Sequence, residues 1–279
     1  MIIRNLYYLM SPNLRLFIRR LKYLIPDSYS AFVGKGDELL PPKGLIFIGG
    51  GDFQRIGSLY LNRFIDLGGL KPEHRILDIG CGIGRIAIPL TTYLNNTGSY
   101  EGFDVVNKGI NWCQKRITPK FPNFQFKYIS LKNKLYNTET NNLAKDFIFP
   151  YKDQEFDFII LTSVFTHMLP EDMENYLKEI YRVMKPGALC YATYFLLNNI
   201  SKLSMVNNDE LNFTLSHGYF RTLKKHLKEA NVAYEESYLV DHYLHSAKFK
   251  VVKTLYGYWS GRSRKDTLDF QDTILLSKG

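Results

Sequence analysis

The chain has 279 residues, of which 45% are hydrophobic and 23% are charged. This composition is that of an ordinary globular protein and excludes disorder as the default state. The formal net charge is +9, from 36 Lys and Arg against 27 Asp and Glu, which favours an anionic partner without naming one. The three cysteines form no C-x-x-C pair, so the sequence predicts neither a disulfide framework nor a metal site.

The sequence shows no cleavable leader and no apolar stretch long enough to span a membrane, so we predict a cytoplasmic protein. The first predicted element is a basic amphipathic helix over residues 13–25 that ends at Pro26. Its apolar stripe comprises Leu14, Phe17, Ile18, Leu21, Leu24 and Ile25. The favoured interpretation is that this stripe packs on the core of the protein. The alternative is peripheral contact with an anionic membrane surface.

A second helix is predicted over residues 53–67, where Gly68 and Gly69 end the pattern. Beyond it, short apolar runs at 75–80, 99–104, 124–129, 156–161 and 188–195 alternate with helical patterns at 84–94, 107–117 and 171–184. Strands separated by helices predict a doubly wound α/β fold with a mostly parallel sheet. Residues 198–218 are predicted as a loop, 219–230 as a helix and 273–276 as a closing strand.

Three glycines follow the first strand in the stretch RILDIGCGIGR, residues 75–85. A strand, a glycine-rich turn and a helix form a site where a nucleotide-like ligand lies close to the backbone. The next strand ends in Asp104, whose carboxylate can accept hydrogen bonds from a ribose diol; the alternative is that Asp104 only caps the following helix. Arg85 stands where a dinucleotide-binding loop requires a third glycine. Asp78 suits a cationic ligand better than a pyrophosphate.

Taken in order, these motifs resemble those of the class I S-adenosylmethionine-dependent methyltransferases. The stretch LDIGCGIGR resembles the first motif of that family, EGFDVV its ribose-binding acid, FPYKDQEFDFIILTSVFTHML its fourth-strand segment, and EIYRVMKPGALCYATYF the helix, turn and fifth strand that follow. The resemblance implies a Rossmann-like, seven-stranded sheet whose last strand, assigned to residues 272–277, is antiparallel. We expect an N-terminal basic helical extension (1–52), a cofactor-binding α/β core (53–197), a substrate-recognition or lid segment (198–268) and a closing strand (269–279).

The resemblance also implies which residues hold S-adenosylmethionine, the expected cofactor. Gly80, Gly82 and Gly84 would line its methionine and ribose end, Asp78 would face its ammonium group, Asp104 would hold the ribose and Val105 would pack on the adenine. Arg85, Ser130, Leu131 and Thr162 complete the predicted cofactor-binding set, with Ser130 near the place where many relatives carry an acid that bonds the adenine amino group.

His167 is the candidate catalytic base. The end of the fourth strand should face the transferred methyl group, and an imidazole titrates near neutral pH. The alternative is a structural histidine, which relatives often carry at this place. The aromatic residues of 198–268 form either a lid over the acceptor or the small core of that segment. The stretch DHYLH (241–245) has the residue types of a metal site, but the favoured interpretation is that its side chains are packing residues.

These features predict a methyltransferase acting on an oxygen or nitrogen atom of a small metabolite, such as a sugar or a lipid-linked intermediate. An RNA or protein methyltransferase is the first alternative because of the positive charge. Nucleic acid is the less favoured partner, since neither an RNA-binding module nor an Asn/Asp-Pro-Pro-Tyr-type motif is recognised in the sequence. A non-catalytic scaffold protein that binds the cofactor is the second alternative, because a fold does not by itself define a function.

Overall fold

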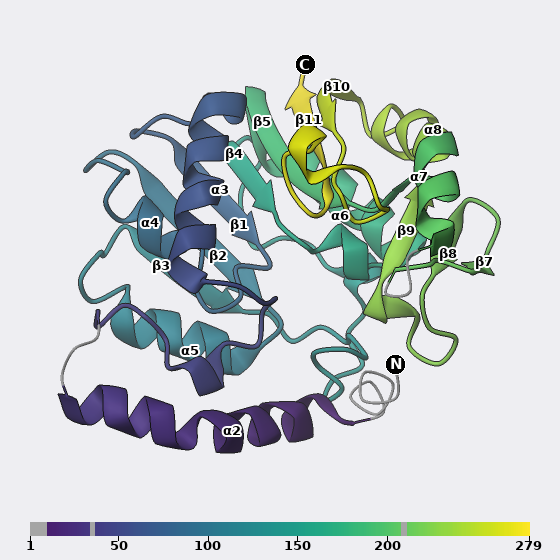
Figure 1. Ribbon diagram of the computed structural model, residues 1–279. Coiled ribbons are helices and arrows are strands. Elements are labelled where there is room, and N and C mark those ends of the chain that lie inside the picture. Colours follow the sequence, from purple (N-terminus) through teal and green to yellow (C-terminus); the bar gives the residue numbers. More distant parts are fainter. Residues whose placement is uncertain (1–9, 34–36, 208–210) are drawn as a thin grey trace. The chain divides into compact units, whose positions relative to one another are not determined.

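The structure is a computed structural model that describes residues 10–33, 37–207 and 211–279. Seven strands form one sheet in the order β10-β11-β5-β4-β1-β2-β3. The pairs that include β11 are antiparallel, whereas β1–β4, β2–β3 and β4–β5 are parallel. The predicted α/β fold, with a mostly parallel seven-stranded sheet and an antiparallel last strand, is therefore confirmed. By its internal contacts the chain divides into two compact units, which we describe one at a time (Figure 1).

Unit 1 comprises the described residues up to His74 together with residues 80–141. It contains the helices α2 (Pro12–Val33), α3 (Phe53–Gly68), α4 (Ala87–Leu90) and α5 (Asn107–Arg116), the 3-10 turn η1 (Lys43–Leu45), and the strands β2 (Ser99–Asp104) and β3 (Phe124–Tyr128). Tyr100 stacks on Phe124 at a centroid distance of 5.2 Å in its core. The two strands are in register up to Asp104 and Tyr128, so their carboxyl ends lie together.

Helix α3 begins and ends as the sequence predicts. The Asp52 carboxylate accepts a hydrogen bond from the Arg55 N–H at 2.7 Å, and Gly69 takes a left-handed conformation just after the last turn. The predicted helix at 84–94 is shorter than expected, since only Ala87–Leu90 are regular helix. The hydroxyls of Thr91 and Thr92 donate to backbone carbonyls three residues earlier, which competes with continuation of the helix.

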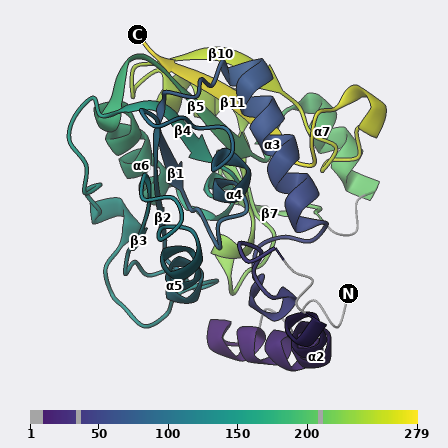
Figure 2. The ribbon, with the colours of Figure 1, turned by 90° about the vertical axis from the view of Figure 1, so that its left-hand side faces the viewer.

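Helix α2 corrects two expectations. It runs from Pro12 to Val33 and contains Pro26 inside it, although a proline costs a helix one backbone hydrogen bond. Beyond that proline, Asp27 accepts hydrogen bonds from the backbone N–H groups of Lys43 and Gly44 at 2.9 and 2.8 Å, so contacts outside the helix stabilise the continuation. The favoured interpretation, in which the apolar stripe packs on the protein core, is wrong, because the stripe is exposed. Figure 2 shows α2 beside α5.

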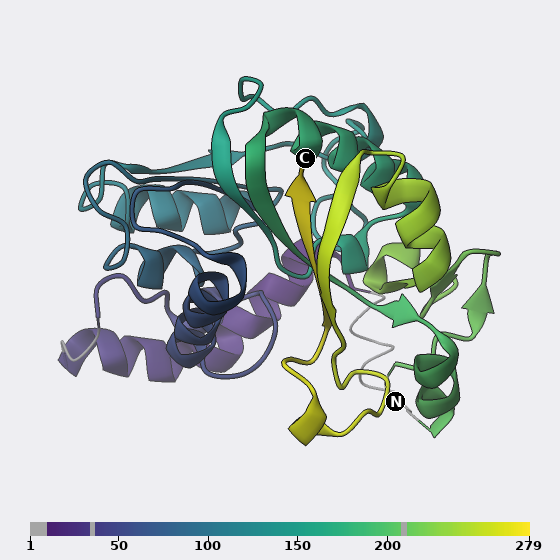
Figure 3. The same ribbon diagram turned by 90° about the horizontal axis from the view of Figure 1, so that it is seen from above.

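Unit 2 comprises Arg75–Ile79 and residues 142–279. Its main-sheet elements are the strands β1 (Arg75–Ile79), β4 (Phe156–Leu161), β5 (Met184–Tyr194), β10 (Phe249–Leu255) and β11 (Asp272–Lys278), with the turns η2 (Ala144–Asp146) and η3 (Phe165–His167) and the helix α6 (Pro170–Val183). Figure 3 shows β10 and β11 side by side. The strand β10 was not predicted, and β5 begins at Met184 rather than 188. The Lys185-Pro186-Gly187 stretch, which follows the helix predicted at 171–184, therefore lies in a strand.

Four short strands between β5 and β10 form a second sheet in the order β6-β9-β8-β7. Besides β10, the elements between β5 and β11 are β6 (Leu196–Leu197), α7 (Asn199–Ser204), η4 (Met205–Asn207), β7 (Leu215–Ser216), β8 (Phe220–Thr222), η5 (Lys228–Ala230) and β9 (Val232–Glu235), followed by α8 (Glu236–Tyr238), the π-helical η6 (Leu239–Leu244) and η7 (Arg264–Asp266). The predicted helix over 219–230 is wrong, because Phe220 and Thr222 pair in an antiparallel ladder with Tyr234 and Val232. The predicted loop over 198–218 contains α7 and β7.

Aromatic side chains form a small core beneath this second sheet. Phe195, Phe213 and Trp259 are buried and lie with ring centroids 5.2 to 5.5 Å apart. Of the two interpretations of the aromatic residues in 198–268, the core is the one observed for Phe213 and Trp259. Asp272, at the start of β11, accepts a hydrogen bond from the Trp259 indole at 2.6 Å.

Candidate functional site

The glycine loop, residues 80–84, lies at the carboxyl end of β2 within unit 1. Gly80, Gly82 and Gly84 all have positive φ angles, of 77°, 61° and 83°. Side chains with a Cβ rarely adopt this conformation. The N–H groups of Gly80 and Cys81 both donate to the Phe103 carbonyl, at 2.8 and 3.1 Å, and so tie the loop to β2. The conformation of the loop therefore requires glycine at alternate positions.

Close packing inside unit 1 adds a second reason for these glycines. A Cβ at Gly82 would lie 2.9 Å from the Ile48 side chain, and one at Gly84 would lie 2.9 Å from Ile117. On α5, a Cβ at Gly109 would lie 2.4 Å from the Gly82 carbonyl oxygen. Other parts of unit 1 thus pack closely on the glycine loop, which allows α5 to begin directly against the loop.

Asp104, the last residue of β2, is the acidic group that unit 1 places beside the glycine loop. It is buried, and its two oxygens accept hydrogen bonds from the N–H groups of Gly82 and Val106, both at 2.8 Å. Burial raises the pKa of Asp104 to about 6, while the backbone N–H groups act in the opposite direction. An ionised carboxylate offers about four acceptor positions, so Asp104 supports the loop and retains capacity for a ligand hydroxyl.

The segment that follows β3 contacts the backbone of Asp104. The Ile129 N–H donates to the Asp104 backbone carbonyl at 3.0 Å, which places Ser130 and the buried Leu131 directly after this contact. Val105 is partly buried beside Asp104. The structure therefore brings together the predicted residues of unit 1: Gly80, Gly82, Gly84, Asp104, Val105, Ser130 and Leu131.

Arg85 also lies in unit 1, but it contacts the segment before α3. Its guanidinium donates to the carbonyls of Ile48 and Gly49 at 3.1 and 2.9 Å and lies over the Phe53 ring. Burial lowers the pKa of Arg85 below its usual value. Through these contacts Arg85 holds the segment before α3 in place. Its role in binding a cofactor stays a prediction.

Unit 2 carries the remaining predicted residues at the carboxyl ends of its own parallel strands. Asp78 on β1 is buried and lies opposite Ile160 of β4, two residues before Thr162. Because the carboxyl ends of parallel strands form the edge where ligands bind in open α/β sheets, Asp78 and Thr162 lie at a suitable edge.

A polar network that sequence reasoning missed lies at that edge of unit 2. The Ser163 N–H donates to the Thr193 hydroxyl at 2.7 Å, and both hydroxyls lie within 3.0 Å of the Gln271 side-chain oxygen. Ser163 is exposed and has a positive φ of 61°, a costly conformation for a residue other than glycine. The only sequence signal was the polar run Thr162-Ser163 after an apolar strand. Thr193 and Gln271 come from distant positions, so no local pattern marked them.

His167 ends the turn η3 and is partly buried. Its Nδ1 lies 2.9 Å from the Glu229 carbonyl oxygen, which connects η3 to η5. Burial lowers the pKa of His167 below its ordinary value, although this hydrogen bond acts in the opposite direction. The ring is therefore neutral near pH 7, and its observed contact is structural.

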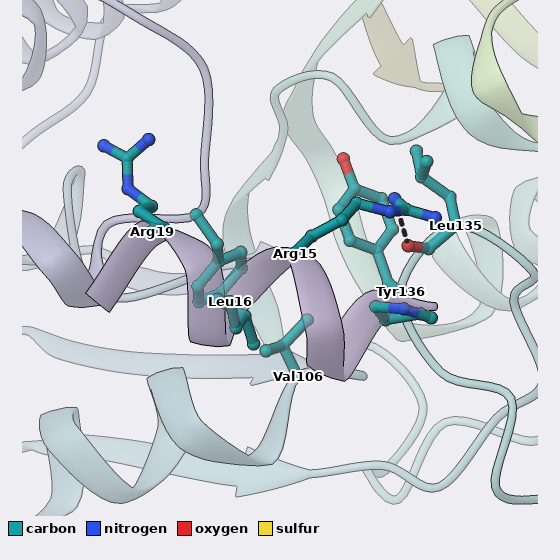
Figure 4. A pocket seen from close by; sticks show the side chains of 8 residues that line it. Arg15, Leu16, Arg19, Val106, Leu135 and Tyr136 are labelled. Atoms are coloured by element: carbon teal, nitrogen blue, oxygen red, sulfur yellow. Dashed lines mark hydrogen bonds between the residues drawn. The ribbon is translucent and has the colours of Figure 1, made fainter. Parts of the chain in front are cut away.

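A pocket of about 90 Å³ lies beneath α2 in unit 1 (Figure 4). It is lined by Pro12, Arg15, Leu16, Arg19, Phe47, Val106, Leu135 and Tyr136. None of these is a predicted cofactor-binding residue, and Arg15 already donates to the Leu135 carbonyl at 3.0 Å.

Among the described residues no group of three or more His, Cys, Asp or Glu side chains could hold a metal ion. Every helix of the described part is too short or too polar to span a bilayer.

Comparison with known proteins adds independent findings. Residues 77–192 match a family model described as a methyltransferase domain. The chain is 32% identical over 158 residues to a demethylmenaquinone methyltransferase of Lactobacillus johnsonii, an alignment that covers 50% of this chain and 58% of the relative. It is 26% identical over 132 residues to a tRNA N(3)-cytidine methyltransferase of Gallus gallus, covering 44% of this chain and 31% of the relative. The chain thus spans less than two thirds of either relative.

A solved structure supports the fold. The S-adenosylmethionine-dependent methyltransferase from Clostridium acetobutylicum matches with a TM-score of 0.52 and 14% identity, covering 82% of this chain and 93% of that chain. The family match extends from β1 to β5 and so includes Asp78, the glycine loop and Asp104. Residues 77–192 therefore match the methyltransferase-domain family, and the chain shares its fold with a solved S-adenosylmethionine-dependent methyltransferase.

Proposed function

We propose that the chain transfers the methyl group of S-adenosylmethionine to an oxygen or nitrogen atom of a small, uncharged acceptor, for which a lipid-linked molecule is the leading class. The observation that carries the acceptor class is the network of Ser163, Thr193 and Gln271, which contains hydroxyl and amide groups and no charged side chain. Such groups suit a hydroxyl or amine of a small molecule, whereas a nucleic-acid backbone is bound mainly by Lys and Arg.

The residues of unit 1 fit the ribose end of this cofactor. Asp104 lies at the end of β2 with its carboxylate fixed by two backbone N–H groups, and it retains capacity for a ribose hydroxyl. When bound, S-adenosylmethionine supplies a methyl group already activated by its sulfonium. The protein then has to orient the acceptor and exclude water.

The test is methyl transfer from isotopically labelled S-adenosylmethionine to three acceptor classes: a demethylated quinol in detergent, a lipid-linked sugar, and total tRNA. We expect label in an uncharged or lipid-linked small molecule and, by NMR, on an oxygen or nitrogen atom. A carbon-methylated product would overturn the proposed atom, and labelled tRNA would overturn the acceptor class. Cofactor binding with no transfer to any acceptor would indicate the non-catalytic scaffold.

An RNA substrate is the second candidate, favoured by the net charge of +9 and by the similarity to a tRNA methyltransferase. Binding driven by phosphate contacts weakens steeply as salt rises. If RNA is the substrate, its affinity should fall by more than tenfold between about 50 and 200 mM salt, as measured by fluorescence anisotropy with total tRNA.

Cofactor affinity should depend on pH through Asp104. Its pKa in the free protein is raised to about 6 by burial, and ribose hydroxyls donate to its ionised form. Protonation therefore competes with binding, so affinity is fully present above pH 7 and falls as pH drops through 6. We expect the dissociation constant of S-adenosylhomocysteine to rise about tenfold from pH 7 to pH 5, measured by calorimetry. An equal rise in the Asp104→Asn variant would assign the effect to another group.

His167→Ala tests the candidate base. The contact with Glu229 predicts a mainly structural loss, with the free energy of unfolding lowered by about 1–3 kcal/mol and kcat lowered by less than about tenfold. Thermal unfolding and steady-state kinetics of the same preparation measure both. A fall in kcat of about a hundredfold or more at an unchanged melting temperature would instead establish general-base catalysis.

A further inference from the structure

Helix α2 exposes its apolar side chains and directs polar ones toward the rest of unit 1. The exposed side chains, here called the apolar face, are Leu14, Phe17, Ile18, Leu21, Leu24, Ile25, Tyr29 and Phe32, with exposed fractions from 44% to 91%. At 100° per residue they fall within an arc of about 140°. The face is therefore continuous along the helix rather than a set of scattered apolar residues.

The opposite side of α2 is held in place by polar contacts. Arg15 is buried and donates to the carbonyls of Met10 and Leu135, both at 3.0 Å. Arg19 donates to the Lys43 carbonyl at 3.1 Å, and Asp27 accepts from the N–H groups that open η1. A Cβ at Gly44 would lie 3.2 Å from the α2 backbone, so η1 approaches the helix closely. These contacts fix which side of α2 is exposed.

The charges that border the apolar face are positive. Arg20 and Lys22 are exposed and lie about 80° to 120° from the centre of the arc, one on each side. Among the exposed residues of α2 whose side chains the structure describes, none is acidic. An apolar face edged by Lys and Arg is the pattern of helices that lie in a membrane interface, where long basic side chains reach the headgroups.

We propose that α2 docks on an anionic lipid bilayer, with the apolar face in the interface and with Arg20 and Lys22 on the headgroups. A soluble monomer seldom leaves so large an apolar face in water, so an occupant is needed. A second copy suits it less well, because a twofold interface over this face would bring the cations of both copies together. Anionic headgroups instead neutralise them. This inference does not rest on the acceptor proposed above, since docking is measured without cofactor or substrate.

The experiment is flotation of the full chain with vesicles of 70% phosphatidylcholine and 30% phosphatidylglycerol, compared with pure phosphatidylcholine. We expect binding to the anionic vesicles, weakened by salt. Phe17→Ser with Leu24→Ser should reduce the partition coefficient by at least about tenfold, from lost apolar burial. Arg20→Ala with Lys22→Ala should reduce it by about 25-fold, or about fivefold per residue, on the anionic vesicles only.

Matched control variants keep the test falsifiable. Ile148 and Val252 are exposed by 74% and 54% and lie outside α2, so Ile148→Ser with Val252→Ser should leave vesicle binding unchanged. Far-ultraviolet circular dichroism checks that every variant remains folded. Absence of binding by the parent chain on either vesicle would overturn the proposal. Self-association by light scattering that is lost in the Phe17 and Leu24 variant, without vesicle binding, would assign the face to a second copy.

Discussion

Replacing Asp104 by Asn is expected to weaken binding of S-adenosylhomocysteine by about 10- to 100-fold, equivalent to about 1.5–3 kcal/mol, the usual contribution of a hydrogen bond to a charged group. Asp104 lies at the end of β2, and the N–H groups of Gly82 and Val106 fix its orientation at 2.8 Å. Asn keeps the shape but removes the charge and places an amide donor where a ribose hydroxyl would donate. Isothermal titration calorimetry of the purified variant measures the loss.

The control for this prediction is another carboxylate on the same strand. Glu101 pairs with Lys127 at 2.9 Å, is partly buried and has no place in the predicted cofactor set, so Glu101→Gln should leave the affinity within about twofold, because only a half-exposed ion pair is lost. Unchanged affinity in Asp104→Asn, at a melting temperature like that of the parent, would restrict Asp104 to the alternative role of fixing the glycine loop and the start of α5.

Asp272→Ala is expected to lower the free energy of unfolding by about 3–5 kcal/mol. The Asp272 carboxylate is fully buried and accepts hydrogen bonds from the N–H groups of Leu196 and Gly257, both at 2.7 Å, and from the Trp259 indole at 2.6 Å. Burial raises its pKa to about 7, against the effect of these donors. Alanine leaves three buried donors without their acceptor. Urea unfolding followed by Trp fluorescence measures the change.

Asp266 provides the control, since it is exposed on η7 of the same unit. Asp266→Ala should change the free energy of unfolding by no more than about 0.5 kcal/mol. A loss of less than about 1 kcal/mol in Asp272→Ala would show that water replaces the carboxylate, and that the β6, Gly257 and Trp259 contacts are held by packing alone.

The parallel part of the sheet was predictable because its signals are local. The strands at 99–104 and 156–161 have the predicted bounds, those at 75–79 and 124–128 end one residue early, and the closing strand extends to Lys278. Apolar runs between glycine-rich or proline-containing turns mark buried parallel strands wherever they pack. The glycine loop was equally local, since its positive φ angles require Gly80, Gly82 and Gly84 whatever lies above them.

The segment after β5 was not predictable by the same reasoning. Phe220, Leu223 and Leu227 repeat at helical spacing, yet Phe220 and Thr222 lie in a strand because Val232 and Tyr234 offer a partner. Short apolar patterns suit either structure, and strand pairing depends on residues distant in sequence. The network of Ser163, Thr193 and Gln271 shows the same dependence, since β5 and the residue before β11 supply two of its three members.

Helix α2 has some properties that follow from its local sequence and others that depend on tertiary contacts. The spacing of Leu14, Phe17, Leu21 and Leu24 alone establishes an amphipathic helix, because periodicity is a property of consecutive residues. Only the tertiary structure decides which side faces water: the hydrogen bonds of Arg15 and Asp27 to distant backbone groups hold the polar side inward. The sequence by itself therefore determined the sheet, the glycine loop and the helix. The tertiary contacts decided that this helix continues past Pro26 and presents its apolar face outward.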